Sequence, residues 1–243
     1  MKSFYIDDSE IADKIILQDK EHLHLSKVLR TKVGEEVCVY NNTQHSYYCI
    51  VESVNKNQSV LKVVKKEYAN TNPKARLDVF IALLKGEKFE FLITKLTELG
   101  ASKIIPFNSQ FCNGKDKGNK AERYRQIAKD ACKQCKRTKL IEIEDALNFE
   151  QMLQSIENYD VAIFAYENQD KGSLSDVLEK IPQNSKVAVI IGSEGGFSEK
   201  EAEMISQTSA IAVSLGNRIL RAETACIMLS SIVLYKLNEF NIN

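Results

Sequence analysis

Residues 186–207 read KVAVIIGSEGGFSEKEAEMISQ, a stretch that passes from strand to turn to helix. The apolar run at 187–191 has strand length and no polar alternation, which is typical of a strand buried on both faces of a parallel sheet. Ser198, followed three residues later by Glu201, predicts a capping box, so a helix should begin at about Glu199. The glycines between strand and helix then lie at the carboxyl edge of a strand, where ligands bind in open α/β sheets.

The same alternation of strand and helix continues through the last two thirds of the chain. It predicts an α/β domain with a mostly parallel sheet. The final segment, 223–240, is apolar around most of its circumference and predicts a helix buried against the sheet or against a second subunit. The expected strands are 77–85, 102–107, 160–167, 186–192 and 210–216, and the expected helices are 87–99, 124–136, 173–181 and 198–206.

The first third of the chain has a different pattern. Three short stretches rich in Tyr and Val, at 35–41, 46–54 and 59–68, are separated by turn-like residues and predict a small β-barrel or meander that ends near Tyr68. The polar, proline-bearing segment 69–76 is typical of a linker. We therefore expect two domains, residues 1–70 and residues 74–243.

The composition is that of an ordinary globular protein, with 44% apolar and 27% charged residues. The 33 basic and 33 acidic residues balance, but 103–139 holds eleven basic and three acidic residues, whereas 140–210 holds four and fourteen. The amino terminus lacks the apolar core of a signal peptide, and no stretch approaches the ~20 apolar residues of a membrane helix. We expect a cytoplasmic protein without membrane contact.

Six cysteines are scattered through the chain, which suits a reducing compartment. Cys132 and Cys135 form a C-x-x-C pair, but one pair without a second pair or nearby histidines is a weak zinc signal. We expect no metal.

A second turn, at 214–225, reads SLGNRILRAETA and places Arg218, Arg221 and Glu223 between apolar elements. Charges in an apolar frame are costly unless they are paired or used. Arg221 and Glu223 either form an inert salt bridge or contribute to a cleft for a flat or partly charged ligand, built from two adjacent strand-end loops. The glycine turn has neither Walker nor dinucleotide-binding spacing, so a nucleotide phosphate is not the expected ligand. A tight turn without a ligand stays the alternative.

Four stretches together resemble the ribosomal small-subunit methyltransferase E family, the uridine-N3 methyltransferases of the SPOUT superfamily. They occur in the family's order: HLSKVLRTKVGEEV (24–37), ALLKGEKFEFLITKLTELGASKIIPF (82–107), IGSEGGFS (191–198) and SLGNRILRAETA (214–225). The resemblance implies an N-terminal PUA-like β-barrel for RNA binding and an α/β SPOUT domain with a C-terminal trefoil knot, an exception to the rule against threading. It also implies a homodimer with the cofactor site near the subunit interface.

The activity implied by the resemblance is methylation of N3 of a specific uridine in the 16S ribosomal RNA of the small subunit, with S-adenosyl-L-methionine as the cofactor. Such a transfer requires nucleophile, methyl carbon and sulfur to be held in line. Arg218 or Arg221 would stabilise negative charge on the uracil, and Glu223 is the nearest candidate base. The glycines would let the backbone approach the cofactor closely. The implied cofactor-binding residues are Tyr166, Glu167, Ile191, Gly192, Glu194, Gly195, Gly196, Leu215, Gly216, Ile219, Leu220, Arg221 and Thr224.

Phosphate contacts to RNA would come from basic residues in both domains. For the basic run in the second domain, a solvated helix face is the alternative. The chain departs from the family pattern in three places: Ser193 and Asn217 stand where proline is usual, and 109–126 lacks the usual serine- and arginine-containing segment. The candidate RNA-binding residues are Lys27, Arg30, Lys32, Lys85, Lys115 and Lys117.

Two other functions stay open at this point. One is a non-catalytic RNA-binding factor for ribosome assembly, against which the intact LGNRILRAET argues. The other is a SPOUT methyltransferase with a different RNA target, a ribose hydroxyl or another base. Fold alone does not decide the target, because function resides in the site.

Overall fold

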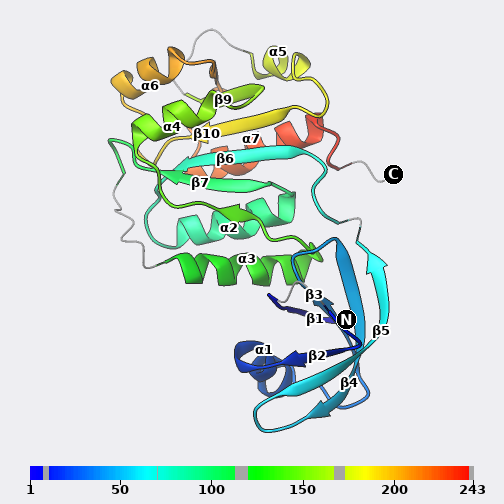
Figure 1. Cartoon of the computed structure of the whole chain (residues 1–243). Helices are drawn as coiled ribbons and strands as arrows, with labels where there is room; N and C mark the ends of the chain where they lie inside the picture. Colours follow the sequence, from blue (N-terminus) through cyan, green and yellow to red (C-terminus); the bar gives the residue numbers. More distant parts are fainter. Residues whose placement is uncertain (8–10, 70, 113–119, 167–172, 241–243) are drawn as a thin grey trace. The chain divides into compact units, whose positions relative to one another are not determined.

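The protein is described by a computed structural model over residues 1–7, 11–69, 71–112, 120–166 and 173–240 (Figure 1). The chain divides into two compact units. Unit 1 is Met1–Asn72 together with Lys129–Leu140, and unit 2 is Pro73–Ala128 together with Ile141–Asn243. The helix α3 (Ala121–Cys135) therefore begins in unit 2, and its C-terminal end belongs to unit 1.

Unit 1 contains a five-stranded sheet in the order β1-β3-β4-β5-β2. The expected meander is present as β3, β4 and β5, which pair antiparallel, and β5 ends at Tyr68. Two strands were not predicted: β1 pairs parallel with β3, and β2 pairs antiparallel with β5. No pairing of β1 with β2 occurs among the described strands, so backbone hydrogen bonds do not close this sheet into a barrel. The strands are β1 (Lys2–Tyr5), β2 (Lys14–Leu17), β3 (Glu36–Tyr40), β4 (His45–Val54) and β5 (Ser59–Tyr68).

The main core of unit 1 lies on one face of this sheet, and a smaller buried cluster that includes Cys38, Tyr40 and Cys132 lies on the other. Alternate residues of the strands, such as Leu17, Val39 and Leu61, point into the main core and are almost fully buried. Leu25 joins them from the short helical segment formed by α1 (Asp19–Leu23) and η1 (His24–Val28). Because Leu25 anchors this segment in the core, Lys27 within it and Arg30 and Lys32 just after it lie on the surface of unit 1.

Unit 2 contains a six-stranded sheet in the order β11-β9-β10-β6-β7-β8, and every pairing in it is parallel. This confirms the predicted α/β class and parallel sheet. Strand β8 was not predicted, because two residues carry no periodicity. The strands are β6 (Arg76–Ala82), β7 (Lys103–Phe107), β8 (Glu142–Ile143), β9 (Val161–Ala165), β10 (Lys186–Ile191) and β11 (Ile211–Val213).

Helices cover both faces of the sheet in unit 2. Met152 and Ile205, from α4 and α6, pack with Phe80 and Ile190 of the sheet. On the other face α7 contacts β6, β10 and α2. Figure 1 shows α4 on the near side of the sheet and α7 on the far side. The helices of unit 2 are α2 (Glu87–Leu99), α4 (Phe149–Ile156), α5 (Leu174–Glu179), α6 (Glu199–Ser206) and α7 (Ala222–Lys236).

The ends of the helices follow the sequence closely. α6 begins at Glu199 with the predicted capping box between Ser198 and Glu201. α2 ends at Gly100, which adopts a left-handed conformation with φ 101°. α4 was not predicted, although Asn148 and its partner three residues later form a second capping box. No helix in the described part of the chain has the length and apolar character needed to cross a bilayer.

Candidate active site

Three loops enclose a cavity of about 190 Å³ at the carboxyl ends of β9, β10 and β11. The loop after β10 is the glycine turn, and the loop after β11 is the arginine-bearing segment. The predicted cofactor residues that line the cavity are Tyr166, Ile191, Gly192, Glu194, Gly195, Gly196, Leu215, Gly216, Ile219 and Leu220. Two loops that lie some twenty residues apart in sequence are thus brought together as expected.

The two loops line one cavity, but the strands that carry them are not neighbours in the sheet. The strand order β11-β9-β10 places β9 between the two strands that carry them. The end of β9 therefore contributes Ala165 and Tyr166 to the cavity, between the other two loops. Sequence alone does not give strand order, because the chain passes from β10 over β9 before it forms β11.

Two predicted cofactor residues stand apart from the lining, and a third is not described. Arg221 and Thr224 are exposed and do not line the cavity. Glu167 lies outside the described residues. Sequence analysis missed several lining residues, although two of them, Ser193 and Phe197, lie within the quoted glycine turn. The missed residues are Ala165, Ser193, Phe197, Ser214, Ala222 and Ala225.

Contacts or backbone conformation within the chain require glycine at each of these three positions of the turn. A Cβ on Gly192 would lie 2.9 Å from the backbone carbon of Gly196, and one on Gly195 would lie 2.9 Å from Cβ of Phe111. Gly196 has φ 69°, in the region that favours glycine. The close approach of a ligand is therefore not needed to explain these glycines, although all three line the cavity.

Ser193 occupies the position where proline is usual, and its side chain is buried, with the residue 4% exposed. Its carbonyl accepts a hydrogen bond from the Gly196 amide at 2.9 Å, and its hydroxyl lies 3.5 Å from the Gly196 carbonyl. Because a proline also has that carbonyl, the bond that closes the turn survives the replacement. Nothing in the structure explains Asn217.

Of the three predicted catalytic residues, only Arg218 lines the cavity. Arg221 is the exposed N-cap residue of α7, and Glu223 lies in the first turn of that helix. The proposed inert salt bridge is absent from the described contacts, in which Glu223 pairs with Lys88 rather than with Arg221. Oε2 of Glu223 is buried and has no hydrogen-bond partner among the described residues.

Lys88 of α2 connects the two loops, and sequence analysis did not identify it. Its Nζ lies 3.2 Å from Oε1 of Glu194 in the glycine turn and 3.7 Å from Oε2 of Glu223. The amide of Lys85 also donates to Glu194, at 3.2 Å. Partial burial raises the pKa of Glu194, but hydrogen bonds from its own amide, the Lys85 amide and Lys88 outweigh burial and hold that pKa below its ordinary value. A carboxylate is thus kept at the cavity wall.

The candidate RNA-binding residues of unit 1 form an exposed basic surface. Lys27, Arg30 and Lys32 are exposed, and none of their side chains forms an ion pair with a described residue. Val28, between Lys27 and Arg30, and Val33, after Lys32, are also exposed, at 69% and 62%. Lys85 is exposed in unit 2, whereas Lys115 and Lys117 lie outside the described residues.

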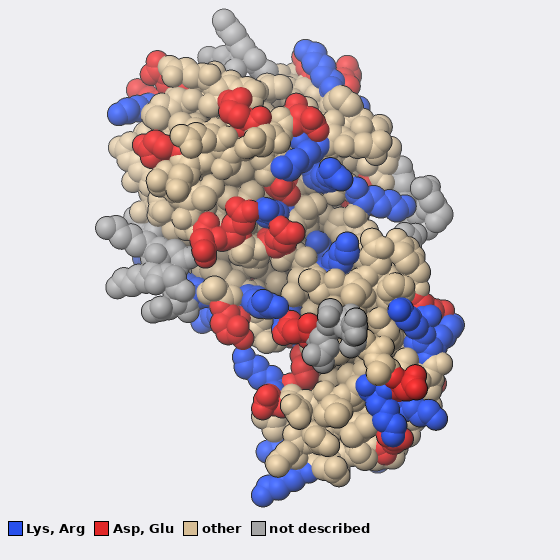
Figure 2. All heavy atoms as spheres, in the orientation of Figure 1, with Lys and Arg blue, Asp and Glu red and all other residues tan. Residues whose placement is uncertain are grey.

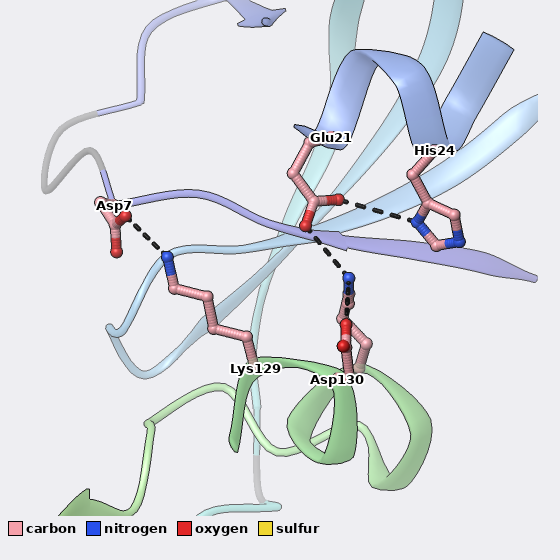
Figure 3. Close-up of polar contacts among 6 residues, drawn as sticks. Asp7, Glu21, His24, Lys129 and Asp130 are labelled. Carbon is pink, nitrogen blue, oxygen red and sulfur yellow. Dashed lines mark hydrogen bonds and ion pairs between the residues drawn. The ribbon is translucent and has the colours of Figure 1, made fainter. Parts of the chain in front are cut away.

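The basic run on α3 is partly committed to contacts within unit 1. Lys129 pairs with Asp7 at 2.7 Å, and Lys133 pairs with Glu21 at 3.0 Å and with Asp130 at 2.8 Å (Figure 3). The side chains of the two lysines are only 14% and 10% exposed, so this end of the helix is not an open RNA-binding face. The alternative of a solvated face is therefore wrong at these two positions, and RNA contact by the rest of the run stays a prediction.

Charges elsewhere are mixed rather than segregated. Figure 2 shows acidic and basic side chains interspersed on one face of the molecule.

No group of three or more His, Cys, Asp or Glu suited to a metal ion occurs among the described residues. Cys132 Sγ donates to the Lys139 carbonyl, and Cys135 Sγ donates to the Cys132 carbonyl.

Comparisons with known proteins agree with this architecture. The family model of the RNA methyltransferase domain matches residues 70–234, and that of the RNA methyltransferase PUA domain matches residues 17–64. The ribosomal RNA small subunit methyltransferase E of Bacillus subtilis is 31% identical over 237 residues, 93% of this chain and 92% of the relative. The protein of the same name from Buchnera aphidicola of Schizaphis graminum is 32% identical over 225 residues, 88% of each chain.

A solved structure is similar over nearly the whole chain. It is that of a putative methyltransferase from Legionella pneumophila in complex with the bound cofactor SAM, 27% identical, with a TM-score of 0.88 and 96% of each chain covered. Fold and site therefore define a protein with a PUA domain and an RNA methyltransferase domain. The chain belongs to the ribosomal RNA small subunit methyltransferase E family.

Proposed function

We propose that this protein transfers a methyl group from S-adenosyl-L-methionine to N3 of a specific uridine in the 16S ribosomal RNA of the small subunit. The observation that carries the proposal is the cavity between the glycine turn and the arginine-bearing loop, at the carboxyl ends of three parallel strands. The names of the relatives support the small-subunit RNA as substrate. Such a substrate would place the activity in the cytoplasm.

The residues of the cavity fit this cofactor. Ile191 and Phe197 offer apolar surface to a flat base, while the backbone groups of Gly192, Leu215 and Gly216 offer hydrogen bonds. A Cβ on Gly216 would meet nothing within 4 Å, so this backbone opens onto free space rather than onto packed atoms. When bound, the cofactor supplies an electrophilic methyl group on a sulfonium. The carboxylate of Glu194 at the cavity wall suits that positive charge.

Two tasks at the uracil fall to charged side chains of the chain itself. N3 of uridine carries a proton, and the negative charge left after its removal spreads onto the flanking carbonyl oxygens. Arg218, which lines the cavity, would stabilise that charge, because arginine stays protonated and donates in a planar fork. Arg221 at the start of α7 would be the second donor.

Glu223 remains our candidate proton acceptor. Its buried Oε2 has an ion-pair partner in Lys88 but no hydrogen bond among the described residues, so one oxygen is available to a proton donor. Because Glu223 does not line the cavity, a small movement of its side chain would be required before it receives the proton.

RNA binding is proposed for the exposed residues Lys27, Arg30 and Lys32 of unit 1 and for Lys85 of unit 2. Unpaired cations on an exposed segment suit phosphate contacts, which fix the position of the protein on RNA without reading sequence. Lys115 and Lys117 remain predictions from the sequence.

A homodimer is proposed from the exposed side of α7. Thr224, Met228 and Tyr235 lie on one side of this helix, and Met228 and Tyr235 are 36% and 73% exposed. Ile219 in the preceding loop is 85% exposed and lines the cavity. A second copy packed here would cover these residues beside the cofactor site. Sedimentation should report a dimer that Tyr235→Asp dissociates; a monomeric wild-type protein at micromolar concentration would contradict the proposal.

A trefoil knot in the C-terminal domain is also proposed. The path of the chain supports it: after β10 the chain passes over β9 to form β11, and α7 then returns to contact β10 and β6. An experimental structure that traces the chain through 113–119 and 167–172 tests this proposal. An unthreaded path would contradict it.

The function itself is tested by one reaction. The protein is incubated with labelled S-adenosyl-L-methionine and small subunits from a strain that lacks the gene, and the labelled nucleoside is mapped. Label on uracil N3 is expected. No incorporation would favour a non-catalytic assembly factor, and label on a ribose or another base would favour a methyltransferase with a different target.

A further inference from the structure

A second hollow adjoins the proposed cofactor cavity. Gln110, Phe111, Cys112 and Gly195 line it, and Gly195 lines both hollows. The loop after β7 thereby meets the glycine turn after β10, and the proposed role of the first cavity leaves this second hollow without a function.

Phe111 is held in a fixed place at the boundary. The Cys112 amide donates to the Ser109 carbonyl at 3.1 Å and closes a turn that contains Phe111. The Gln110 amide donates to Oε1 of Glu201 at 2.7 Å, and Glu201 is only 7% exposed. Oε2 of the same carboxylate accepts from the Ser198 amide in the capping box of α6. One buried carboxylate thus fixes both the start of α6 and the loop that carries Phe111.

The ring is nevertheless exposed to solvent. Phe111 is 40% exposed, whereas Phe107 at the end of β7 and Phe197 in the glycine turn are 0% and 8% exposed. Cβ of Phe111 would be only 2.9 Å from a Cβ on Gly195, so any side chain at position 195 would displace Phe111. The chain therefore keeps an aromatic side chain on a hydrogen-bonded loop and open to solvent beside the cavity, rather than burying it in the core.

We propose that Phe111 is a stacking platform for the target base, an unpaired pyrimidine of the substrate RNA. The proposal rests on the proposed function, because N3 lies on the pairing edge of uracil and is reached only when the base leaves its stack. An extruded base loses stacking energy, and an aromatic ring that is already ordered restores part of it at low entropic cost. The base would lie against the ring with its N3 edge toward the cofactor cavity.

The test also distinguishes two other roles for the Phe111 ring. The ring would belong to the cofactor site if it stacks on the adenine of S-adenosyl-L-methionine. It would be a simple apolar cover for Gly195 if only its bulk matters.

The first test compares Phe111→Ala, Phe111→Leu and Phe111→Tyr on small subunits lacking the modification, with Phe240→Ala as a control at a phenylalanine that is 47% exposed and lines neither hollow. We expect kcat/KM for the subunits to fall by roughly 5- to 150-fold in the Ala and Leu variants, the range of one lost stacking contact, and to be largely retained in the Tyr variant. The Kd for S-adenosyl-L-methionine, measured by calorimetry, should stay within about twofold. Full activity of the Leu variant, or a parallel loss of cofactor affinity, would overturn the proposal.

The second test does not depend on turnover. The chain has no tryptophan, so Phe111→Trp introduces a single indole whose fluorescence reports contact with a base. Titration with a short oligouridylate in the presence of S-adenosylhomocysteine should quench Phe111→Trp and leave Phe240→Trp unchanged, with RNA binding followed independently by anisotropy of a labelled oligonucleotide. Bound RNA without selective quenching would overturn the stacking role. Selective quenching by a protein that methylates nothing would instead refute the proposed function alone.

Discussion

Lys88 Nζ lies 3.7 Å from Oε2 of Glu223, which links helix α2 to the first turn of α7. The same ammonium group lies 3.2 Å from Glu194 in the glycine turn. One cation thus joins two loops that the sequence separates by almost thirty residues. Because the side chain of Glu223 is only 16% exposed, loss of the cation would leave its carboxylate poorly compensated.

Lys88→Met should lower the rate of methylation by more than about tenfold, because Glu223 and Glu194 would lose their shared partner. The free energy of unfolding should fall by about 1–3 kcal/mol, because the mostly buried carboxylate of Glu223 would lose its cation. Lys95→Met is the matched control, because Lys95 lies on the same helix and pairs with Glu98. Equal activity of the two variants in a labelled-methyl assay would rule out this role for Lys88.

Arg218→Ala should lower kcat by roughly 100- to 1000-fold, the cost of removing one donor from a developing oxyanion. Cofactor affinity should change much less, because glycine and apolar residues make up most of the rest of the cavity wall. Arg221→Ala should also abolish methylation if Arg221 is the second donor. Rapid-quench kinetics and calorimetry separate the two effects; full turnover of Arg221→Ala with unchanged cofactor affinity would remove Arg221 from the mechanism.

Gly195→Ala should destabilise the protein by about 1–3 kcal/mol, because the new Cβ would overlap Phe111. In a Phe111→Gly background, which removes that Cβ, the same substitution should cost less. Urea unfolding of the two single variants and the double variant gives this coupling energy. Additive costs would show that Phe111 is not what requires glycine at position 195.

Asp78 gives the stability of unit 2 a defined dependence on pH. Burial raises the pKa of this carboxyl above its ordinary value, although the Tyr159 hydroxyl donates to it at 2.7 Å and lowers that pKa in part. The folded state therefore holds the proton more tightly than the unfolded state does. This contribution to stability is fully present below the unfolded pKa of about 3.9 and is lost as pH rises through the folded pKa.

Asp78→Asn should remove that loss, because an amide keeps an acceptor for Tyr159 and does not ionise. The variant should gain stability relative to the wild type as pH rises from about 4 to 7. Denaturant unfolding across this range measures the difference. A difference that shrinks with rising pH would mean that the wild-type carboxylate is stabilised, not destabilised, by its surroundings.

Charge reversal at Lys27, Arg30 and Lys32 should weaken RNA binding and reduce its dependence on salt. Each lost phosphate contact should lower the slope of log K against log salt by about 0.7–0.9. Lys14→Glu is the control in the same unit, because Lys14 is paired with Glu52. An unchanged slope in the triple variant would place the phosphate contacts elsewhere.

The sequence predicted those parts of the fold whose signals are local. The box of Ser198 and Glu201 located the start of α6, and Gly100 located the end of α2, because caps depend on neighbouring residues alone. Helix α4 was missed although it is as long as α6 and although Asn148 and Gln151 carry the same local signal as Ser198 and Glu201. Strand order was not predictable, because the passage over β9 is set by packing between distant segments.

The candidate site was predictable to a similar extent. Two motifs supplied ten residues of the cavity wall, but Lys88 was missed because its partners, Glu194 and Glu223, are distant in sequence. From the sequence, the glycines were assigned to close approach of the cofactor. A contact within the chain is enough to explain one of them, since Phe111 already requires Gly195. Such contacts between loops have no signature in a single sequence.

The most direct measurement is to map the nucleoside that this protein labels in small subunits from a strain that lacks the gene. We expect one labelled position, N3-methyluridine in the small-subunit RNA, and loss of the label with Arg218→Ala. Absence of label with the wild-type protein, or label on a ribose or another base, would contradict it.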